Sequence, residues 1–366
     1  MATWTKQKLG DIAEMKYGKM PSKKKVGLGN YKIFSGYRYF DAYPESNCKK
    51  GDVIIVARGV GGTGDIKISK CDCYLTNLSI KILLDQTQVN NRYFYYKYLL
   101  STLRYLDSGS AQSQITINDL EKLQVNLPDL PTQTCIASVL SAYDDLIENN
   151  EKRINALEEM AQLLYTEWFV KFKFPGHEKV KMVESGTEYE MMPEGWEVKN
   201  VESLIKRIPV GKKYENKSVF ETGKVPVLDQ GKTGLIGYHN DEPGVKASVE
   251  NPVIVFANHT CYQNIIMYPF SAIQNVLPFI PNDKRDIFWL NWATKDLIKF
   301  NDYKGHWPEF MAKKLVVPPA DLTKIFGVLV GKYVALRYEL EMKNKNLSKN
   351  RDLLIPQLVT GKRELK

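Results

Sequence analysis

The sequence predicts an α+β protein in which two mixed α/β domains are separated by two long helices, which pair with each other as an intramolecular coiled coil. Two observations predict the helices: apolar residues keep a heptad spacing over residues 134–172, and again over residues 322–354. A third predicts an internal pseudo-twofold repeat, because the sequence flanking the first helix recurs 190 residues later. The expected segments are a domain at 1–133, a helix at 134–172, a connector at 173–193, a domain at 194–321 and a helix at 322–366.

The first long helix is expected because residues 134–172 contain neither glycine nor proline and carry a narrow apolar seam. A helix of this length would extend roughly 55–60 Å. A single amphipathic helix lying on a globular core is the alternative, but the length and the narrow seam favour a helix with a partner helix. The residues expected to make the pairing contacts are Ile136, Leu140, Ile147, Asn150, Ile154, Leu157 and Leu164.

The C-terminal segment repeats this pattern with the opposite charge. Residues 134–172 carry 3 basic and 7 acidic side chains, whereas residues 322–366 carry 10 basic and 4 acidic ones. The two helices are therefore complementary and are expected to pair within the chain, with the polar Asn150, Lys343 and Asn350 fixing the register. The second set of expected pairing residues is Leu329, Leu336, Leu340, Leu347 and Leu354.

The globular segments also correspond to each other. The stretch GDVIIVARG at residues 51–59 matches NPVIVFANH at residues 251–259, and each is a buried type of strand that leads into a polar loop. The first loop has the Gly59-x-Gly61-x-x-Gly64 spacing of a dinucleotide-binding turn, but alternating strand residues follow it where that turn requires a helix. Since the second copy lacks the glycines, a shared pyrophosphate site is excluded, and the loops are typical of surfaces that read different targets.

Composition limits the class of protein. The net charge of +9 indicates a polyanionic partner, and residues 1–133 contribute most of it, with 19 basic and 12 acidic side chains. No apolar run approaches a membrane span and the start of the chain lacks a signal peptide, so we expect a cytoplasmic protein without membrane contact. The five cysteines do not have the spacing of a zinc site, and no metal or cofactor site is expected.

Enzyme motifs are incomplete as well. The tripeptide Gly231-Lys232-Thr233 could end a phosphate-binding loop, but Pro226 stands where that loop requires glycine. An adenine methyltransferase would need an Asn/Asp-Pro-Pro-aromatic motif, whereas the nearest run, Val317 to Ala320, has neither the polar residue nor the aromatic one. We therefore expect a protein that is not itself an enzyme.

The stretch LPDLPTQTCIASVLSAYDDLIENNEKRINALEEMAQLLYTEWFVKFKFPGHE, residues 127–178, resembles the central region of type I restriction–modification specificity (S) subunits. The C-terminal LLIPQLVTGKREL and the duplicated architecture extend the resemblance over nearly the whole chain. It implies two target-recognition domains that each read half of a bipartite double-stranded DNA sequence, and helices that fix the spacer. It also implies docking of two methyltransferase subunits and, through the complex, of motor–nuclease subunits. S-adenosylmethionine, ATP and Mg²⁺ would belong to those partners, and the chain itself would need no cofactor.

Side chains able to contact phosphates or base edges are the candidate DNA-binding residues. In the first domain they are Lys23, Lys24, Lys25, Arg38, Arg58, Gln112, Ser113 and Gln114, and in the second Lys212, Lys213, Lys232, Asn258, His259, Lys304 and His306. An ordinary solvated surface charge is the alternative for each lysine. For the whole chain, the alternatives are a coiled-coil scaffold with protein-binding globular ends and a standalone DNA-modifying enzyme.

Overall fold

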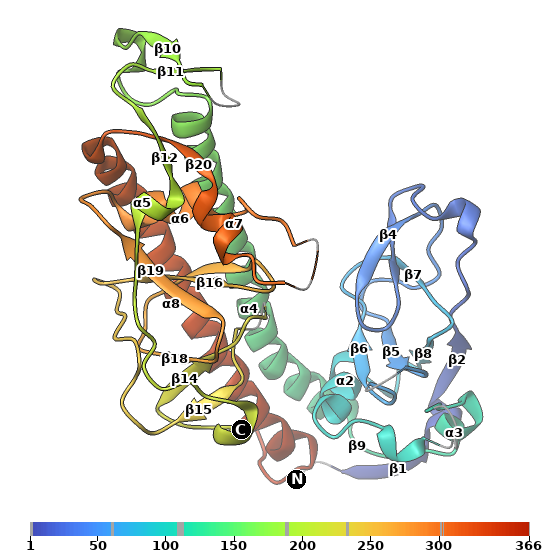
Figure 1. Ribbon diagram of the computed structural model, residues 1–366. Helices are drawn as coiled ribbons and strands as arrows, with labels where there is room; N and C mark the ends of the chain where they lie inside the picture. Colours follow the sequence, from blue (N-terminus) through green and yellow to red (C-terminus); the bar gives the residue numbers. More distant parts are fainter. Residues whose placement is uncertain are drawn as a thin grey trace. The chain divides into compact units, whose positions relative to one another are not determined.

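A computed structural model describes residues 3–59, 62–107, 113–186, 190–231, 234–300, 302 and 304–365 (Figure 1). The chain forms two compact units: residues 1–150 together with residues 343–366, and residues 151–342. Each unit therefore contains one globular domain and one part of each long helix.

The first domain is built from three small sheets around the buried strand β5 (Val53–Val56). Because all four residues of β5 are apolar and buried, this strand occupies the centre of a sheet ordered β2-β8-β5-β6. A second sheet has the order β4-β3-β7, and β1 pairs with β9. The bounds of the other elements are β1 Trp4–Lys8, α1 Leu9–Ile12, β2 Ala13–Tyr17, β3 Tyr31–Phe34, β4 Tyr39–Tyr43, β6 Ile66–Ile68, β7 Cys73–Leu75, β8 Ser79–Leu84, α2 Asn91–Leu99, α3 Ile117–Glu121 and β9 Gln124–Pro128.

The second domain repeats this topology element by element. Its central strand β16 (Val253–Ala257) is likewise apolar and buried, and its sheets have the orders β13-β19-β16-β17, β15-β14-β18 and β12-β20. In both domains the first and third strands of the smaller sheet are parallel, β3 with β7 and β14 with β18. The predicted internal repeat is confirmed. The remaining bounds are β12 Glu197–Asn200, α5 Val201–Leu204, β13 Ile205–Arg207, β14 Val225–Leu228, β15 Gly237–His239, β17 Gln263–Ile266, β18 Ser271–Ala272, β19 Val276–Pro281, α6 Ile287–Thr294, α7 Trp307–Ala312 and β20 Lys314–Val317.

The two long helices are α4 (Leu130–Tyr165), which continues into a π-helical turn at Thr166–Val170, and α8 (Ala320–Val359). Helix α4 begins before the predicted residue 134 because Asp129 caps it: its carboxylate accepts a hydrogen bond of 2.8 Å from the Thr132 N–H. Pro131 is tolerated in the first turn, where a backbone donor would have no helical partner. The connector between the helix and the second domain contains a hairpin, β10 (Met182–Glu184) with β11 (Met191–Pro193).

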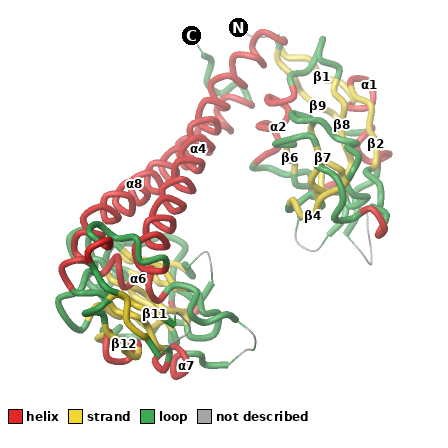
Figure 2. Tube along the Cα trace, turned by 90° about the horizontal axis from the view of Figure 1, so that it is seen from above, coloured by secondary structure: helices red, strands yellow, loops and turns green. Residues whose placement is uncertain are grey.

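Helices α4 and α8 lie side by side and run antiparallel (Figure 2). In the first unit Arg351 pairs with Asp144, and Asn150 donates to the Asn344 side chain at 2.8 Å. In the second unit Arg337 pairs with Glu158 at 2.8 Å. The predicted intramolecular pairing of an acidic with a basic helix is thus confirmed.

The predicted seam of α4 is buried or half-buried throughout, but the seam of α8 differs in part from the prediction. Leu329 is 37% exposed, and Val330 on the next position is buried in its place. Asn344, not Lys343 or Asn350, supplies the polar contact to α4. The cause is visible in the sequence, since Leu329 and Val330 are both apolar and only packing against a neighbour decides between them.

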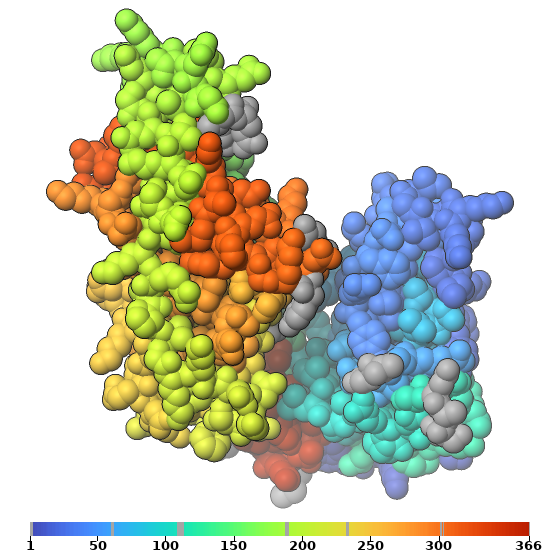
Figure 3. Space-filling model, viewed as in Figure 1, coloured from blue at the N-terminus to red at the C-terminus, as the bar shows by residue number. Residues whose placement is uncertain are grey.

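Both ends of the helix pair enter the domain cores. In the first unit, Ile136 and Leu140 of α4 and Ile355 and Leu358 of α8 pack into the same core as β5. The C-terminal segment accordingly lies against the first domain (Figure 3, dark red). In the second unit Trp168 and Phe169 pack with Phe326 of α8. None of the helices in the described ranges is both long and apolar enough to span a membrane.

Candidate nucleic-acid interface

Three loops meet at the end of β5 in the first domain. Loop A (residues 35–38) joins β3 to β4, loop B (the described residues 57–59 and 62–65) joins β5 to β6, and loop C (the described residues 104–107 and 113–116) precedes α3. Loop C is joined to loop B by an Ile115 N–H donating to the Ala57 carbonyl at 2.9 Å and by a β-bridge between Arg58 and Gln114. The first residues of loop B are therefore held beside loop C.

Glycines in loop B allow this close packing. A side chain at Gly62 would lie 2.3 Å from the ring of Tyr37 in loop A, and one at Gly64 would lie 2.4 Å from the backbone nitrogen of Arg104. Gly64 also has a positive φ of 94°, which favours glycine. Gly62 and Gly64 thus allow neighbouring loops to pack closely.

The resulting surface is cationic. Arg38, Arg58 and Arg104, one from each loop, are exposed, and within the described ranges none of them has an ion-pair partner. Guanidinium groups without carboxylate partners are suited to contacts with phosphates or with guanine edges.

The second domain brings the corresponding three loops together with different chemistry. Its loop A (the described residues 229–231 and 234–236), loop B (residues 258–262) and loop C (the described residues 302 and 304–307) are held together by contacts of Asn258 and Gln230. Asn258 accepts from the His306 N–H through its backbone oxygen and from the Trp307 N–H through its side chain, at 2.9 and 2.8 Å. The Gln230 side chain accepts from the His259 N–H at 2.9 Å. Amide and imidazole groups here occupy the place of the arginines.

Comparison with known proteins relates this architecture to one family. Residues 1–159 match the family model described as the type I restriction modification DNA specificity domain. The MjaIX type I restriction enzyme specificity subunit of Methanocaldococcus jannaschii is 24% identical over 98% of this chain and 93% of that protein. An Escherichia coli type I restriction enzyme specificity subunit is 25% identical over 46% of this chain and 45% of its own length. Residues 1–159 therefore resemble a DNA specificity domain, and nearly the whole chain is similar to a type I restriction enzyme specificity subunit.

The fold agrees with this resemblance. The crystal structure of a type I restriction–modification S subunit from M. genitalium superposes with a TM-score of 0.64 at 18% identity, covering 98% of this chain and 96% of that one.

The structure divides the predicted contact residues into exposed, paired and partly buried side chains. Lys23 and Lys24 are exposed in a 3₁₀ turn, while Lys25 is paired with Glu45 at 2.5 Å. Gln114 and Ser113 are partly buried and tied to Asp107, the Gln114 N–H donating to its carboxylate at 2.8 Å. These two residues brace loop C. Gln112 and Lys232 lie outside the described residues.

In the second domain, the structure contradicts the prediction that His306 lies on the exposed surface. Its side chain is fully buried, and it contacts the Asp302 carbonyl at 3.0 Å and lies 3.5 Å from Glu309. Its buried side chain therefore shapes loop C from inside the domain and has no surface with which to contact a ligand. Lys212 is paired with Asp241 at 3.0 Å and lies over the Tyr214 ring. Lys213, Lys304 and Thr260 are exposed, and Asn258 and His259 are half-buried within the loop cluster.

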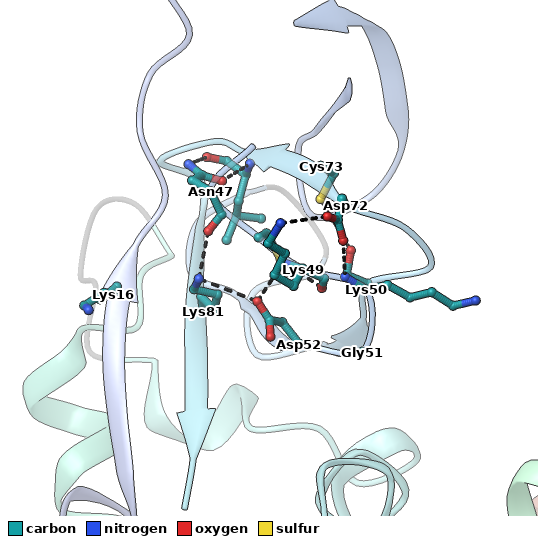
Figure 4. A network of polar contacts seen from close by, with 12 residues as sticks. Lys16, Asn47, Lys49, Lys50, Gly51, Asp52, Asp72, Cys73 and Lys81 are labelled. Carbon is teal, nitrogen blue, oxygen red and sulfur yellow. Dashed lines mark hydrogen bonds and ion pairs between the residues drawn. The ribbon is translucent and has the colours of Figure 1, made fainter. Parts of the chain in front are cut away.

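Several lysines of the first domain have structural roles at the opposite end of β5 (Figure 4). Lys81 donates to the Asn47 carbonyl at 2.8 Å and lies 3.5 Å from Asp52, and Lys49 pairs with Asp72 at 2.8 Å. These contacts hold residues 47–52 against β7 and β8. The net charge of the domain therefore overstates the number of cations available to DNA.

Sequence reasoning missed Tyr37, Arg104 and Gln230. The alternating aromatic residues around Tyr37 predict strand packing, yet Tyr37 itself is 47% exposed in loop A. Its position next to Gly36 and Arg38, between two strands, is the feature that could have identified it. Arg104 lies more than forty residues from Arg58, and only the fold brings the two together.

Proposed function

We propose that this chain is a specificity subunit that reads a bipartite sequence in double-stranded DNA, one half with each α/β domain. The observation that carries the proposal is the three-loop cluster, which recurs at the same end of the same fold with different side chains. A frame that is kept while its loops change is the arrangement expected of two readers with separate targets.

The chemistry of the two clusters supports different half-sites. Arginine can pair with both acceptors of guanine in the major groove, whereas asparagine and glutamine pair with adenine. The first cluster presents Arg38, Arg58 and Arg104, and the second presents Asn258, His259 and Gln230. We expect the first half-site to contain a guanine contact and the second to be read mainly through neutral groups.

The long helices are proposed to fix the unread spacer and to dock two methyltransferase subunits. Support for two copies of one partner comes from exposed apolar residues that recur at equivalent repeat positions. Leu163 of α4 is 64% exposed and Leu353 of α8, its counterpart, is 57% exposed. A surface that is repeated within one chain can bind the same partner twice.

The methylation and cleavage reactions are proposed to be carried out by the partner subunits. The methyltransferase subunits would supply S-adenosylmethionine, and motor–nuclease subunits, joining through the complex, would supply ATP and Mg²⁺. The specificity subunit would contribute the sequence choice and the geometry.

A domain exchange tests the proposal. Residues 1–128 are replaced by the equivalent domain of a relative, and methylated positions are mapped in cells that also express the cognate methyltransferase subunit. One half of the methylated sequence should change while the other half and the spacer stay the same. A change in both halves, or in neither, would rule out independent reading.

A protein-binding scaffold remains the competing function, and salt dependence separates the two. A DNA reader should lose duplex affinity steeply as salt rises, because each phosphate contact releases counterions. Binding that is unaffected by salt, or that does not distinguish DNA sequences, would favour the scaffold.

A further inference from the structure

We propose that Tyr37 is a positioning residue that determines the half-site read by the first domain. It touches no base in this scheme but fixes the path of loop B and, through it, the place from which Arg58 acts. The inference rests on the proposed function and adds a residue to it.

The contact of Tyr37 with loop B is close, and a larger residue at Gly59 or Gly62 would require the ring to move. A β-carbon on Gly59 would lie 2.6 Å from the Tyr37 hydroxyl, and one on Gly62 would lie 2.3 Å from a ring carbon. Heavy atoms cannot approach this closely, so the ring occupies the space that two side chains of loop B would otherwise take. Tyr37 and the glycines therefore form one packed unit.

The start of loop B is fixed from another direction. The backbone nitrogens of Ala57 and Arg58 both donate to the Leu78 carbonyl, at 2.9 and 3.1 Å, and Arg58 forms the β-bridge to Gln114. The Thr63 hydroxyl closes the loop by donating to the Gly59 carbonyl at 3.1 Å. Between these contacts, the Tyr37 ring packs against both Gly59 and Gly62.

The surroundings of Tyr37 connect it to the cationic surface. Burial raises the pKa of Tyr37, Asp65 raises it further, and Arg104 and the Gly62 backbone lower it. The phenol thus remains neutral, and it lies near Arg104 of loop C as well as Asp65 at the end of loop B. One side chain of loop A accordingly contacts or neighbours both other loops.

The second domain gives independent support. Gln230 of its loop A holds loop B by two hydrogen bonds: its side chain accepts from the His259 N–H at 2.9 Å, and its carbonyl accepts from the Thr260 hydroxyl at 2.5 Å. The residue type differs and the glycines are absent, but loop A again fixes loop B. The same relationship is therefore built twice with different chemistry.

Reading a base edge requires an accurately placed guanidinium, because a supporting shell that is loose by about 1 Å commonly abolishes such a site. The test compares Tyr37→Ser, Tyr37→Phe, Gly62→Ala and the double variant Tyr37→Ser/Gly62→Ala, each in complex with the methyltransferase subunit. The probes are duplexes that carry the mapped target or single base-pair changes in either half.

Tyr37→Ser should reduce discrimination within the first half-site by roughly 5- to 150-fold, the range that one bidentate base contact supplies. Discrimination within the second half-site and the thermal unfolding midpoint should stay the same. Tyr37→Phe should retain discrimination because the ring remains. Gly62→Ala should act like Tyr37→Ser, and the double variant should be no worse than Tyr37→Ser alone, because the clash requires both groups. Gln230→Ala provides the mirror-image control and should affect the second half-site.

Unchanged discrimination by Tyr37→Ser would overturn the inference and leave the proposed function intact. Equal losses in both half-sites would also overturn it, since they indicate a general loss of fold. If the unmodified complex itself fails to discriminate in either half, the proposed function fails instead.

Discussion

Exposed cations of the first domain differ in how firmly the backbone holds them. Arg58 donates its N–H to the Leu78 carbonyl at 3.1 Å and is bridged to Gln114, so its side chain starts from a fixed point. Lys24 is in an exposed 3₁₀ turn, Lys23–Lys25, with no buried residue. A fixed guanidinium suits a base edge, whereas a lysine in an exposed turn suits a phosphate.

We therefore expect Arg58→Ala and Lys24→Ala to weaken binding in different ways. Arg58→Ala should cost about 1–3 kcal/mol on the matched duplex and much less on a duplex already altered in the first half-site. Lys24→Ala should weaken all duplexes alike and reduce the salt slope by about 1. Titrations of matched and altered duplexes at several salt concentrations measure both effects. Equal losses on the two duplexes for Arg58→Ala would assign it to the phosphate backbone.

The second domain contains a buried histidine with a different role. His239 is 2% exposed, its Nδ1 contacts the Asp241 N–H at 3.0 Å and its Nε2 contacts Ser271 at 2.9 Å. Burial lowers its pKa, Asp241 opposes this and Lys212 adds to it. The folded state therefore favours the neutral ring, whereas in the unfolded chain the imidazole has a pKa of about 6.5.

The second unit should consequently become less stable as the pH is lowered. Below about 6.5 the unfolded chain binds the proton more readily, so the stabilisation present above that value is lost as pH falls through the lower folded pKa. Tryptophan fluorescence can follow the unfolding, because five of the six tryptophans, all but Trp4, lie in this unit. The midpoint temperature should drop between pH 7.5 and 5.5, and His239→Gln should flatten that dependence. An identical pH dependence in the variant would remove His239 as its cause.

At the scale of elements, the helix pair includes one uncharged polar contact. Asn150 is 8% exposed, and its side-chain amide donates a hydrogen bond of 2.8 Å to the side-chain oxygen of Asn344. Such pairs lower the stability of a coiled coil but restrict its register. Losing one partner leaves a buried amide unsatisfied, whereas replacing both by leucine removes the polar groups together.

Asn150→Leu alone should therefore destabilise the chain by about 1–3 kcal/mol. The double variant Asn150→Leu/Asn344→Leu should recover that loss. Urea unfolding of the two variants and the unmodified chain measures the difference. Asn350→Leu, at an exposed position of α8, is the matched control and should change the free energy of unfolding little. A double variant no more stable than the single one would contradict the pairing.

The helices also show how far the sequence could predict the structure. Periodicity located α4 and its buried Leu140 and Asn150, because burial repeats with the helix turn. On α8 two neighbouring apolar residues, Leu329 and Val330, left the face undecided. The loop cluster was predicted in part, through Arg58 and His259. Tyr37 and Arg104 were not predicted, since their positions depend on contacts between segments far apart in sequence.

For the whole molecule, the antiparallel pairing defines which residues must change together. The sequence repeat aligns Glu158 with Ser348, but in the structure Glu158 faces Arg337. A lengthened helix pair therefore needs insertions after Arg153 and after Glu341, which lie across from each other. Seven residues preserve the heptad seam and add about 10 Å of helix, the rise of about three base pairs.

If the helices set the spacer, this double insertion should lengthen it by about three base pairs and leave both half-sites unchanged. Mapping of methylated positions in cells expressing the altered chain provides the measurement. Insertion after Arg153 alone is the control and should lower DNA methylation by the complex. It moves Asn150 away from Glu158 but leaves the distance between their partners, Asn344 and Arg337, unchanged. Retention of the old spacer after the double insertion would refute the role of the helices in spacing.

The core of the first unit has a consequence for biosynthesis. Ile355 and Leu358, near the end of the chain, pack against residues from the first domain, and the Tyr93 hydroxyl donates to the Val359 carbonyl at 3.4 Å. The ribosome makes the first domain earliest, yet supplies these partners last. The second unit, residues 151–342, is continuous in sequence. During translation the later domain should therefore mature before the earlier one. A chain truncated after residue 342 and released from the ribosome should be digested by protease within its first 150 residues while the second unit resists.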